Sequence, residues 1–498
     1  MTSSELVLEY AAESVGLSAA EYRAAVDELR YRRGFLLERS VDGGPARSGW
    51  SAERLGAYVL STHPDTALVV VRGDGVEVAL LGEAFDPWQP ELRPEGVADV
   101  VHQVVRRGEE HLLELLDRLA GRFRVLVVRG EVATAWHDAM GSGAVVYDEA
   151  GGTCASHAAL LAEHLGRTHR DYVIPFLTTR NYRLRDVKYF PGALSPYDGV
   201  LHLTPNTRLD VGSGTVERYW PREALAPVTV DDASRTLEEY LVGQAEWFRS
   251  AGRTPLLGVT AGTDSRGLLA AFAEGSPTLF TYVRSEGGRL ESNHDSRTAQ
   301  ALAAAVGLSV AVLQVRDVVP LNTTLRPIDV AYRSASGGIR GGNSAWVGAI
   351  QRDVEVRPEH LMVRGFGGEV MRGFYQQMPT AMTHLSPNQL ARTYDVNAGA
   401  AVTRAAFRHL MDTTDMQRAV ALGMDPNDVL YWEHRMGVWG SITMLESELA
   451  TASMPGYNSR RLFSAFLGLD YVTRHSRQVI HDTFRRMRPE LMGPEHHL

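Results

Sequence analysis

The stretch Leu257-Gly258-Val259-Thr260-Ala261-Gly262-Thr263-Asp264-Ser265-Arg266 is the most informative part of this sequence about its fold. An apolar run over 255–260 leads into it and predicts a strand, and a helical pattern follows over 265–274. The turn between them contains small residues, a hydroxyl at each end and one carboxylate. Backbone N–H groups of such a turn wrap a pyrophosphate, and the positive end of the helix adds to the attraction. The turn lacks the lysine of a Walker loop, so we do not expect it to bind a γ-phosphate in the way that a Walker loop does.

Strands and helices alternate around this turn. A helix is predicted over 231–250 before it, and strand, helix and strand are predicted over 278–283, 293–306 and 308–315 after it. Such a run with short connections predicts a doubly wound parallel sheet, whose ligands bind beyond the carboxyl ends of the strands. From about Pro379 onward the pattern is mostly helical.

The N-terminal half has a different pattern. It opens with helical spacing over 5–29, and the first strand is expected at 67–72, paired with 76–81 around Gly73-Asp74-Gly75. A helix is expected over 97–119, followed by short strands at 123–128, 132–136, 144–147 and 153–156. These elements predict an antiparallel α+β domain that ends near Leu165. The Pro- and Gly-rich stretch that follows, with a hairpin over 199–209, is expected to be a connector.

Composition excludes several classes of protein. The 498 residues are 44% hydrophobic and 22% charged, which is typical of a soluble chain of two or three domains. The net charge of −9 and the lack of a basic run disfavour nucleic acid as a partner. A single cysteine, Cys154, excludes a disulfide framework and a cysteine-based zinc site. We expect a cytoplasmic protein without a membrane partner, because neither a signal segment nor a long apolar run is visible.

The turn carries a family resemblance. Thr260-Ala-Gly-Thr-Asp-Ser265 resembles the Ser-Gly-Gly-x-Asp-Ser pyrophosphate loop of asparagine synthetase and its relatives, with Thr260 and Ala261 as the altered positions. Phe280–Val283 with Asp295 resembles the next strand and helix of that family. Val363-Arg-Gly-Phe-Gly-Gly-Glu369 resembles its second glycine loop. In the other half, Leu119-Ala-Gly-Arg-Phe123 and Trp136-His-Asp-Ala-Met-Gly141 are similar to late strands of the family's glutaminase domain.

The resemblance implies an α/β protein in three parts. Residues 1–170 would be a degenerate glutamine-amidotransferase-like domain of the Ntn type, and 171–228 a connector. Residues 229–498 would be a synthetase domain with a doubly wound parallel sheet of the pyrophosphatase-loop kind and a helical C-terminal part. The glutaminase needs a cysteine after the initiator methionine, where this chain has Thr2. Without glutamine cleavage the nitrogen nucleophile must be an amine from a substrate.

β-Lactam synthetases and lasso-peptide cyclases are relatives that lack the glutaminase. The implied function is therefore an ATP-dependent ligase that adenylates a carboxylate, releases pyrophosphate and transfers the acyl group to an amine in specialised-metabolite or peptide biosynthesis. Small-molecule or peptide carboxylates and amines would be its substrates. The resemblance is compatible with a homodimer. Phe366 stands where β-lactam synthetases have a tyrosine that helps to deprotonate the amine, so that route of closure is disfavoured. No lysine occurs near the C-terminus to steady the acyl transfer, which leaves Arg474 or Arg477 as the cation.

The resemblance assigns ATP and Mg²⁺ as cofactors. The nucleotide-binding residues would be Thr260, Ala261, Gly262, Thr263, Asp264, Ser265, Tyr282, Asp295 and Gly367. The catalytic residues would be Asp264, Glu369 and Arg477, of which Asp264 and Glu369 hold the metal.

Alternatives stay open at this point. The glycine turns and Asp295 equally suit an ordinary strand-to-helix turn and a helix cap. An ammonia-dependent asparagine synthetase would share the fold and the first half-reaction. A non-catalytic nucleotide-binding descendant would bind ATP without releasing pyrophosphate. A sulfur-transfer enzyme of the same fold is disfavoured by the single cysteine.

Overall fold

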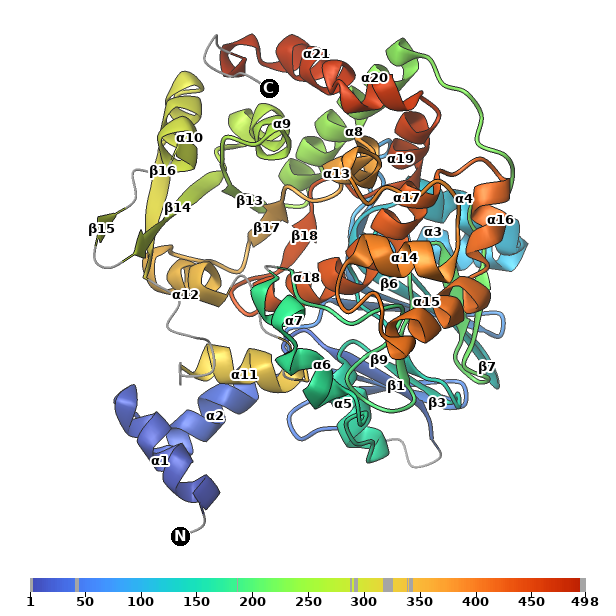
Figure 1. Ribbon diagram of the computed structural model, residues 1–498, viewed down its shortest axis with the longest axis vertical. Coiled ribbons are helices and arrows are strands. Elements are labelled where there is room, and N and C mark those ends of the chain that lie inside the picture. The colour runs from blue at the N-terminus through green and yellow to red at the C-terminus, as the bar shows by residue number, and fades with distance from the viewer. Residues whose placement is uncertain are drawn as a thin grey trace.

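The computed structural model describes residues 3–40, 44–185, 187–286, 289–290, 294–316, 326–337, 339 and 344–492. The chain opens with the expected helical pair, α1 (Ser3–Ser14) and α2 (Ala19–Leu29). Ser18 caps α2 in a reciprocal pair with Glu21, whose carboxylate accepts from the Ser18 N–H at 2.8 Å. The pair projects from the body of the molecule and packs on α11 (Pro327–Ala335) (Figure 1).

The prediction that the first strand begins at residue 67 is wrong. Three strands precede it, β1 (Phe35–Arg39), β2 (Ser51–Leu55) and β3 (Tyr58–Thr62). β1 pairs on both sides, with β3 and with β9 (Thr153–Ala155), so it is interior and is short and almost fully buried at its start. β2 lies at the edge and is half-exposed, so its residues lack the alternation that marks a strand in the sequence.

Two six-stranded antiparallel sheets form the N-terminal half. The first runs β10-β8-β9-β1-β3-β2, and the second runs β12-β11-β7-β6-β5-β4. Their remaining members are β4 (Leu68–Gly73), β5 (Val76–Phe85), β6 (Ala120–Arg129), β7 (Val132–His137), β8 (Val146–Asp148), β10 (Val200–His202), β11 (Thr207–Asp210) and β12 (Thr215–Arg218). The β4–β5 hairpin confirms the prediction around Gly73-Asp74-Gly75. The single helix expected over 97–119 is two, α3 (Pro94–Arg107) and α4 (Glu109–Arg118), because Gly108 breaks it at a φ of 137°.

The segment expected to be a connector contributes strands to both sheets. β10 pairs with β8 in the first sheet, whereas β11 pairs with β7 in the second. The hairpin expected over 199–209 is therefore wrong, because its two arms lie in different sheets. The actual hairpin joins β11 to β12. The same region holds the short helices α6 (Val173–Thr178) and α7 (Arg180–Leu184), which follow α5 (Ala158–Leu165).

A parallel sheet forms the second half. Its order is β16-β14-β13-β17-β18, with strands β13 (Thr254–Gly258), β14 (Thr278–Glu286), β16 (Val310–Arg316), β17 (His360–Arg364) and β18 (Ser453–Pro455). The short β15 (Arg289–Leu290) is antiparallel to β14. From β13 the chain winds first toward β14 and β16 and then returns to the other side for β17 and β18. This doubly wound order places the switch point between β13 and β17.

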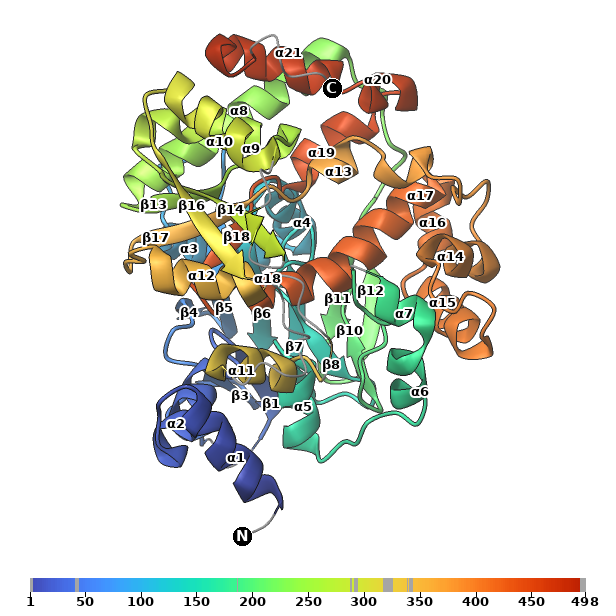
Figure 2. The ribbon, with the colours of Figure 1, turned by 60° about the vertical axis from the view of Figure 1, so that its left-hand side comes forward.

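Helices cover this sheet and fill the C-terminal part (Figure 2). Those packed on its strands are α8 (Val230–Ser250), α9 (Thr263–Phe272), α10 (His294–Ala305) and α12 (Ser344–Asp353). The later ones are α13 (Gly368–Met371), α14 (Pro387–Tyr394), α15 (Ala401–Thr413), α16 (Met416–Ala421), α17 (Pro426–Val429), α18 (Ser441–Ser447), α19 (Arg460–Leu467), α20 (Tyr471–His475) and α21 (Gln478–Met487). A π-helix, η3 (Leu430–Gly440), precedes α18, and the 3₁₀ turns are η1 (Ala273–Gly275), η2 (Phe374–Gln377) and η4 (Pro489–Leu491).

One hydrophobic core runs through both halves. It includes Val78 of β5, Leu256 of β13 and Phe484 of α21, all almost inaccessible to solvent. In the part of the chain that the structure describes, no helix is both long and apolar enough to cross a bilayer.

Candidate functional site

A cleft of about 240 Å³ opens at the switch point of the parallel sheet. The turn after β13 forms one side and the turn after β17 forms the other. Its walls are Gly258, Val259, Thr260, Gly262, Asp264, Ser265, Phe280, Thr281, Tyr282, Trp346, Met362, Val363, Arg364, Gly365 and Phe366. The strand-turn-helix context predicted for the pyrophosphate loop is therefore present, and the loop faces a cavity.

The two hydroxyls of the loop fix its shape. The Thr260 N–H donates to Ser265 Oγ at 3.2 Å, and the Gly262 N–H donates to Thr260 Oγ1 at 3.1 Å. The hydroxyls also contact each other at 3.1 Å. These hydrogen bonds all lie within the turn, so the hydroxyls of Thr260 and Ser265 fix the conformation of the loop without a ligand.

The start of α9 is left open toward the cleft. Gly262 is the N-cap and supplies no side-chain cap, so the N–H groups at Thr263, Asp264 and Ser265 in the first turn stay available to an anion. Ala261 does not adopt a positive φ, so its methyl group, at a position where the motif that it resembles has glycine, is accepted without backbone strain.

Asp295, predicted as a nucleotide-binding residue, holds the loop from α10. Its Oδ1 accepts from the Ala261 N–H at 3.1 Å. The Ala261 N–H therefore already has a hydrogen-bond acceptor in the protein, whereas the sequence predicted that it would bind a phosphate. The structure thus gives Asp295 a positioning contact with the pyrophosphate loop.

Asp264 and Glu369, the two predicted metal ligands, lie close enough for their charges to interact. Burial and the neighbouring Asp264 carboxylate together raise the pKa of Glu369, while Arg372 lowers it. Glu369 Oε2 is enclosed and has no hydrogen-bond partner in the described part of the chain. Arg372 donates hydrogen bonds to both carboxylate oxygens of Asp264. The Nη2–Oδ2 distance is 3.1 Å, and Nη1 lies closer to Oδ1.

This donor set fits a divalent cation. The charges of two carboxylates interact, and within the described residues one of their oxygens lacks a partner, which is what a small hard cation with additional phosphate and water ligands requires. Arg372 now supplies the positive charge, and although burial lowers its pKa, the charge of Asp264 raises it above its ordinary value overall. The described residues contain no cluster of three or more potential metal ligands, so protein oxygens alone would not complete the coordination.

Two glycines allow the second loop to approach Asp264. Gly367 has a φ of 103°, and a Cβ there would overlap the Tyr457 carbonyl oxygen. A Cβ on Gly368 would overlap Asp264 Oδ1 in the same way. The paired glycines quoted from the sequence are therefore required for contact between the two loops.

An aromatic wall bounds part of the cleft. Trp346 stacks with both Phe280 and Tyr282, with centroid distances of 6.0 and 6.4 Å and interplanar angles of 23° and 8°. The Arg364 guanidinium lies 5.0 Å from the Trp346 ring centroid and 4.3 Å from that of Phe366. The sequence predicts Tyr282 at this site, but it does not predict Trp346 or Arg364. Trp346 lies far along the chain from the pyrophosphate loop, so no local pattern marks it.

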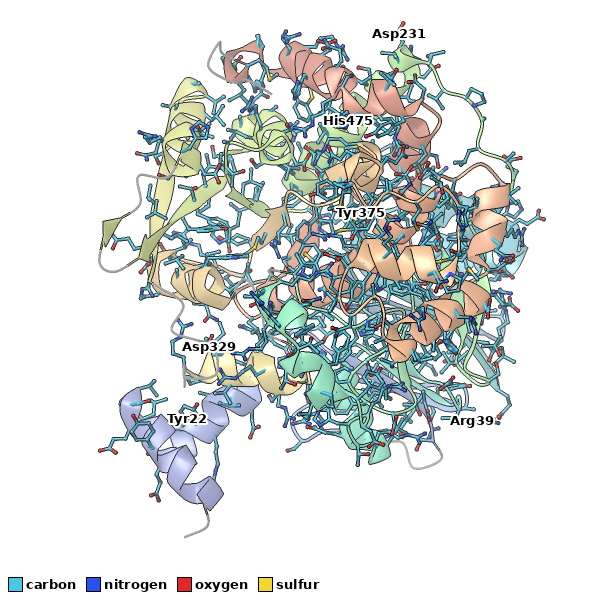
Figure 3. All side chains as sticks on the ribbon, viewed as in Figure 1. Tyr22, Arg39, Asp231, Asp329, Tyr375 and His475 are labelled. Carbon is cyan, nitrogen blue, oxygen red and sulfur yellow. The ribbon has the colours of Figure 1, made fainter. Side chains whose placement is uncertain are left out.

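A second cation, Arg435, lies close enough to Glu369 to lower the pKa of its carboxyl slightly. Arg435 of η3 lies within 6.0 Å of four aromatic ring centroids, those of Phe374, Tyr375, Tyr431 and Trp439, and its Nε lacks a partner among the described residues. Burial, followed by the charge of Glu369, raises the pKa of Tyr431 well above its ordinary value. Figure 3 places Tyr375 in the interior, among the C-terminal helices. In the sequence Arg435 belongs to a helix that matches the family only loosely, and no motif assigns it to the site.

Arg474 and Arg477, the candidate catalytic cations, differ in environment. Arg474 is buried, pairs with Asp428 at 2.7 Å and donates to the carbonyls of Val370 and Met371, so it holds the second glycine loop in place. Arg477 is the N-cap of α21 at a φ of 58° and does not line the cleft. Glu433, from the predicted helical wall, pairs with Arg218 at 2.7 Å and so binds β12 to η3.

Comparisons with known proteins give limited similarity. No protein-family model matches the chain, and no curated protein matches it. Among solved structures, glutamine phosphoribosylpyrophosphate amidotransferase from B. subtilis, complexed with ADP and GMP, is 12% identical with a TM-score of 0.24 over 70% of this chain and 73% of that one. A structure described as the allosteric regulatory enzyme of purine biosynthesis is 11% identical with a TM-score of 0.26, covering 76% and 75%. Similarity this weak carries no argument about activity.

Proposed function

We propose that this chain is an ATP-dependent, AMP-forming ligase of the asparagine synthetase kind that joins a carboxylate to an amine. One observation carries the proposal. A strand-turn-helix loop with an open helix N-terminus carries Asp264, whose charge interacts with that of Glu369, at the switch point of a parallel sheet, and aromatic side chains line the same cleft. These features would suit a phosphate group, a divalent cation and a nucleobase in one place, and so support the proposal.

Each part of the cleft has a role in this reaction. The α9 N-terminus binds the β- and γ-phosphates, and Trp346 and Phe280 accept the adenine face. A bound Mg²⁺, held by Asp264 and Glu369, would neutralise phosphate charge in the transition state. Arg372 orients Asp264, and the two glycines of the second loop keep Glu369 close to it.

The chemistry balances in two steps. A carboxylate oxygen attacks the α-phosphorus, the bond to the bridging oxygen breaks, and pyrophosphate leaves from an acyl-AMP. A neutral amine then attacks the acyl carbon, the bond to AMP breaks, and one proton is lost as the amide forms. Phe366 carries no proton acceptor, and the raised pKa of Tyr431 keeps its phenol protonated at neutral pH, so neither side chain removes that proton.

The test is acid-dependent exchange of labelled pyrophosphate into ATP, screened over amino acids, peptides and small carboxylates. We expect exchange with at least one acid, and its loss by at least about a hundredfold in Asp264→Asn because one missing charged contact costs several kcal/mol in the transition state. Asp231→Asn is the matched control, since Asp231 is exposed at the start of α8 (Figure 3) and is not among the residues that line the cleft. Exchange that persists in Asp264→Asn would contradict the proposal.

A second candidate, a non-catalytic nucleotide-binding protein, is favoured by one observation. Arg372 occupies both oxygens of Asp264, and the loop satisfies several of its own donors. This candidate predicts saturable ATP binding without pyrophosphate exchange for any acid, even when amines are added. An ammonia-dependent asparagine synthetase would instead show exchange with aspartate.

A further inference from the structure

An arginine-rich cleft lies at the opposite end of the parallel strands. Its volume is about 570 Å³, and the parallel strands contribute their first residues to it, including His360 of β17 and Ser453 of β18. The N-terminal sheets contribute Gly82 of β5 and two arginines of β6, and β6 and β18 pack together near the centre of the molecule (Figure 1). Arg364, at the far end of β17, lines the candidate active site, so about 13 Å of strand separates the two cavities.

Six arginines line this cleft, and three carboxylates face them. The arginines are Arg32, Arg33, Arg122, Arg124, Arg253 and Arg357, and the carboxylates are Asp65, Glu83 and Glu448. Each carboxylate has one arginine as its main partner: Asp65 binds Arg32 at 2.7 Å, Glu83 binds Arg253, and Glu448 binds Arg122. The cleft therefore carries excess positive charge after its own ion pairs are counted.

Two buried arginines form the bottom of the cleft. Arg122 and Arg124 are each 2% exposed and occupy alternate positions on β6, so both side chains leave the same face of the strand. Arg124 has no carboxylate within 4.0 Å among the residues described, and it donates only to the Ala144 carbonyl, at 3.3 Å. The Nη2 atoms of both arginines lack a partner in the same part of the chain.

A buried charge without a partner of opposite charge destabilises the folded state, and the pKa of Arg124 reflects this. Burial and the neighbouring Arg122 lower the pKa of the Arg124 guanidinium to about 9. A buried arginine with a purely structural role normally pairs with a carboxylate or several carbonyl groups. Guanidinium N–H groups that form no hydrogen bond in a protein interior destabilise the fold. The unused donors point to a ligand that supplies acceptor oxygens.

We propose that this cleft binds a small multivalent oxyanion, carried on phosphate or carboxylate groups, with Arg122 and Arg124 at its base and Arg33 and Arg357 nearer its mouth. Guanidinium forks match both kinds of oxyanion. Arg33 is held for this role by a hydrogen bond of 2.6 Å to the Glu448 carbonyl, and Arg357 is 56% exposed in its side chain and so lies at the entrance. The site is separate from the proposed nucleotide cleft, so either proposal can fail without the other.

Isothermal titration calorimetry on the full-length chain tests the proposal, with pyrophosphate and citrate as probes and acetate as the monovalent control. We expect at least one of the two multivalent anions to bind with one ligand in this cleft, more tightly than acetate and less tightly as salt increases. Tighter pyrophosphate identifies a phosphate ligand, and tighter citrate identifies a polycarboxylate. Binding of both no tighter than acetate would overturn the proposal.

Variants locate the binding. Arg124→Gln should weaken it by about tenfold or more, because one charge-assisted hydrogen bond is lost. Since Arg124 is buried and its replacement can also impair folding, Arg357→Gln is the second variant, expected to weaken binding about threefold or more. Arg249→Gln is the matched control, because Arg249 is likewise exposed and, within the described residues, its ion pair is with a neighbouring glutamate, Glu246. Equal affinity in Arg357→Gln and Arg249→Gln, or loss of binding only in the loop variant Thr260→Val, would overturn it.

Discussion

At the residue scale, three charged side chains determine what the candidate site can bind. Asp264, Glu369 and Arg372 share one small volume, and Arg372 supplies the only positive charge in direct contact with Asp264 within the described chain. Their arrangement resembles a metal site in which an arginine stands in for the cation. The guanidinium and a metal ion should therefore compete for the same carboxylates.

Arg372→Gln should make the protein depend on magnesium. Without the guanidinium, two adjacent carboxylates lose their counter-charge, and we expect the free energy of unfolding to fall by about 2–4 kcal/mol in the absence of metal. Added Mg²⁺ should raise the melting temperature of this variant more than that of the unaltered protein. Arg235→Gln, at an exposed ion pair on α8, is the control. Equal magnesium shifts in Arg372→Gln and in the unaltered protein would argue against a metal site here.

Glu369→Gln should stabilise the protein at neutral pH. The pKa of Glu369 is raised in the folded state, so the folded state holds its proton more tightly than the unfolded chain does. Stability is then greatest below the unfolded pKa and falls as pH rises from about 4.5 toward the folded pKa, by about 1.4 kcal/mol for each pH unit between the two pKa values. The glutamine variant does not lose stability in this way. In urea unfolding, its free energy of unfolding should therefore exceed that of the unaltered protein at pH 7, and the difference should vanish near pH 4. An advantage of the same size at both pH values would contradict the charge argument.

Some of these residues can be predicted from the sequence and others cannot. Thr260, Asp264, Ser265 and Glu369 occupy glycine-containing turns directly after strands, and the structure places these two turns on either side of one cleft. Arg372 follows Glu369 by three positions, but nothing in its local sequence shows that it reaches back to Asp264. Trp346 and Arg435 enter through the packing of α12 and η3, which no pattern in a single sequence specifies.

At the element scale, the aromatic wall is the part of the cleft most open to a direct test. Trp346→Ala removes the ring that stacks on Phe280 and Tyr282. Because a nucleobase stacked on an aromatic ring gains about 1–3 kcal/mol, we expect the dissociation constant for ATP to rise by roughly 5- to 100-fold. Trp346→Phe retains a ring and should keep most of the affinity. Unchanged ATP affinity in Trp346→Ala would place the adenine elsewhere.

The elements also show what periodicity can predict. The strands and helices around the pyrophosphate loop are long and regular, and the structure contains each of them near its predicted position. β1 and β2 escape sequence prediction because β1 is short and its first three residues are all buried, without alternation, and edge strand β2 mixes serine, glutamate and arginine with its apolar residues. The expected 199–209 hairpin failed because proximity in sequence suggested pairing where β10 and β11 belong to different sheets.

At the scale of the whole molecule, the halves should unfold together. One hydrophobic core joins them, and the buried pair between Arg218 and Glu433, with side chains 1% and 0% exposed, fastens the N-terminal sheets to η3. We expect one calorimetric transition for the full chain and a loss of about 3–5 kcal/mol in Glu433→Gln, because Arg218 is left buried without its partner. Glu238→Gln, at an exposed pair, should change little. Two separate transitions would show that the halves are energetically independent.

The proposed reaction requires ATP to bind at the switch point of the parallel sheet. A crystal structure of the full chain with a non-hydrolysable ATP analogue and Mg²⁺ would show whether it does. We predict phosphate oxygens against the N–H groups at Thr263, Asp264 and Ser265, the metal between Asp264 and Glu369, and the adenine beside Trp346. A nucleotide bound outside this cleft, or an empty cleft at saturating analogue concentration, would contradict the proposal.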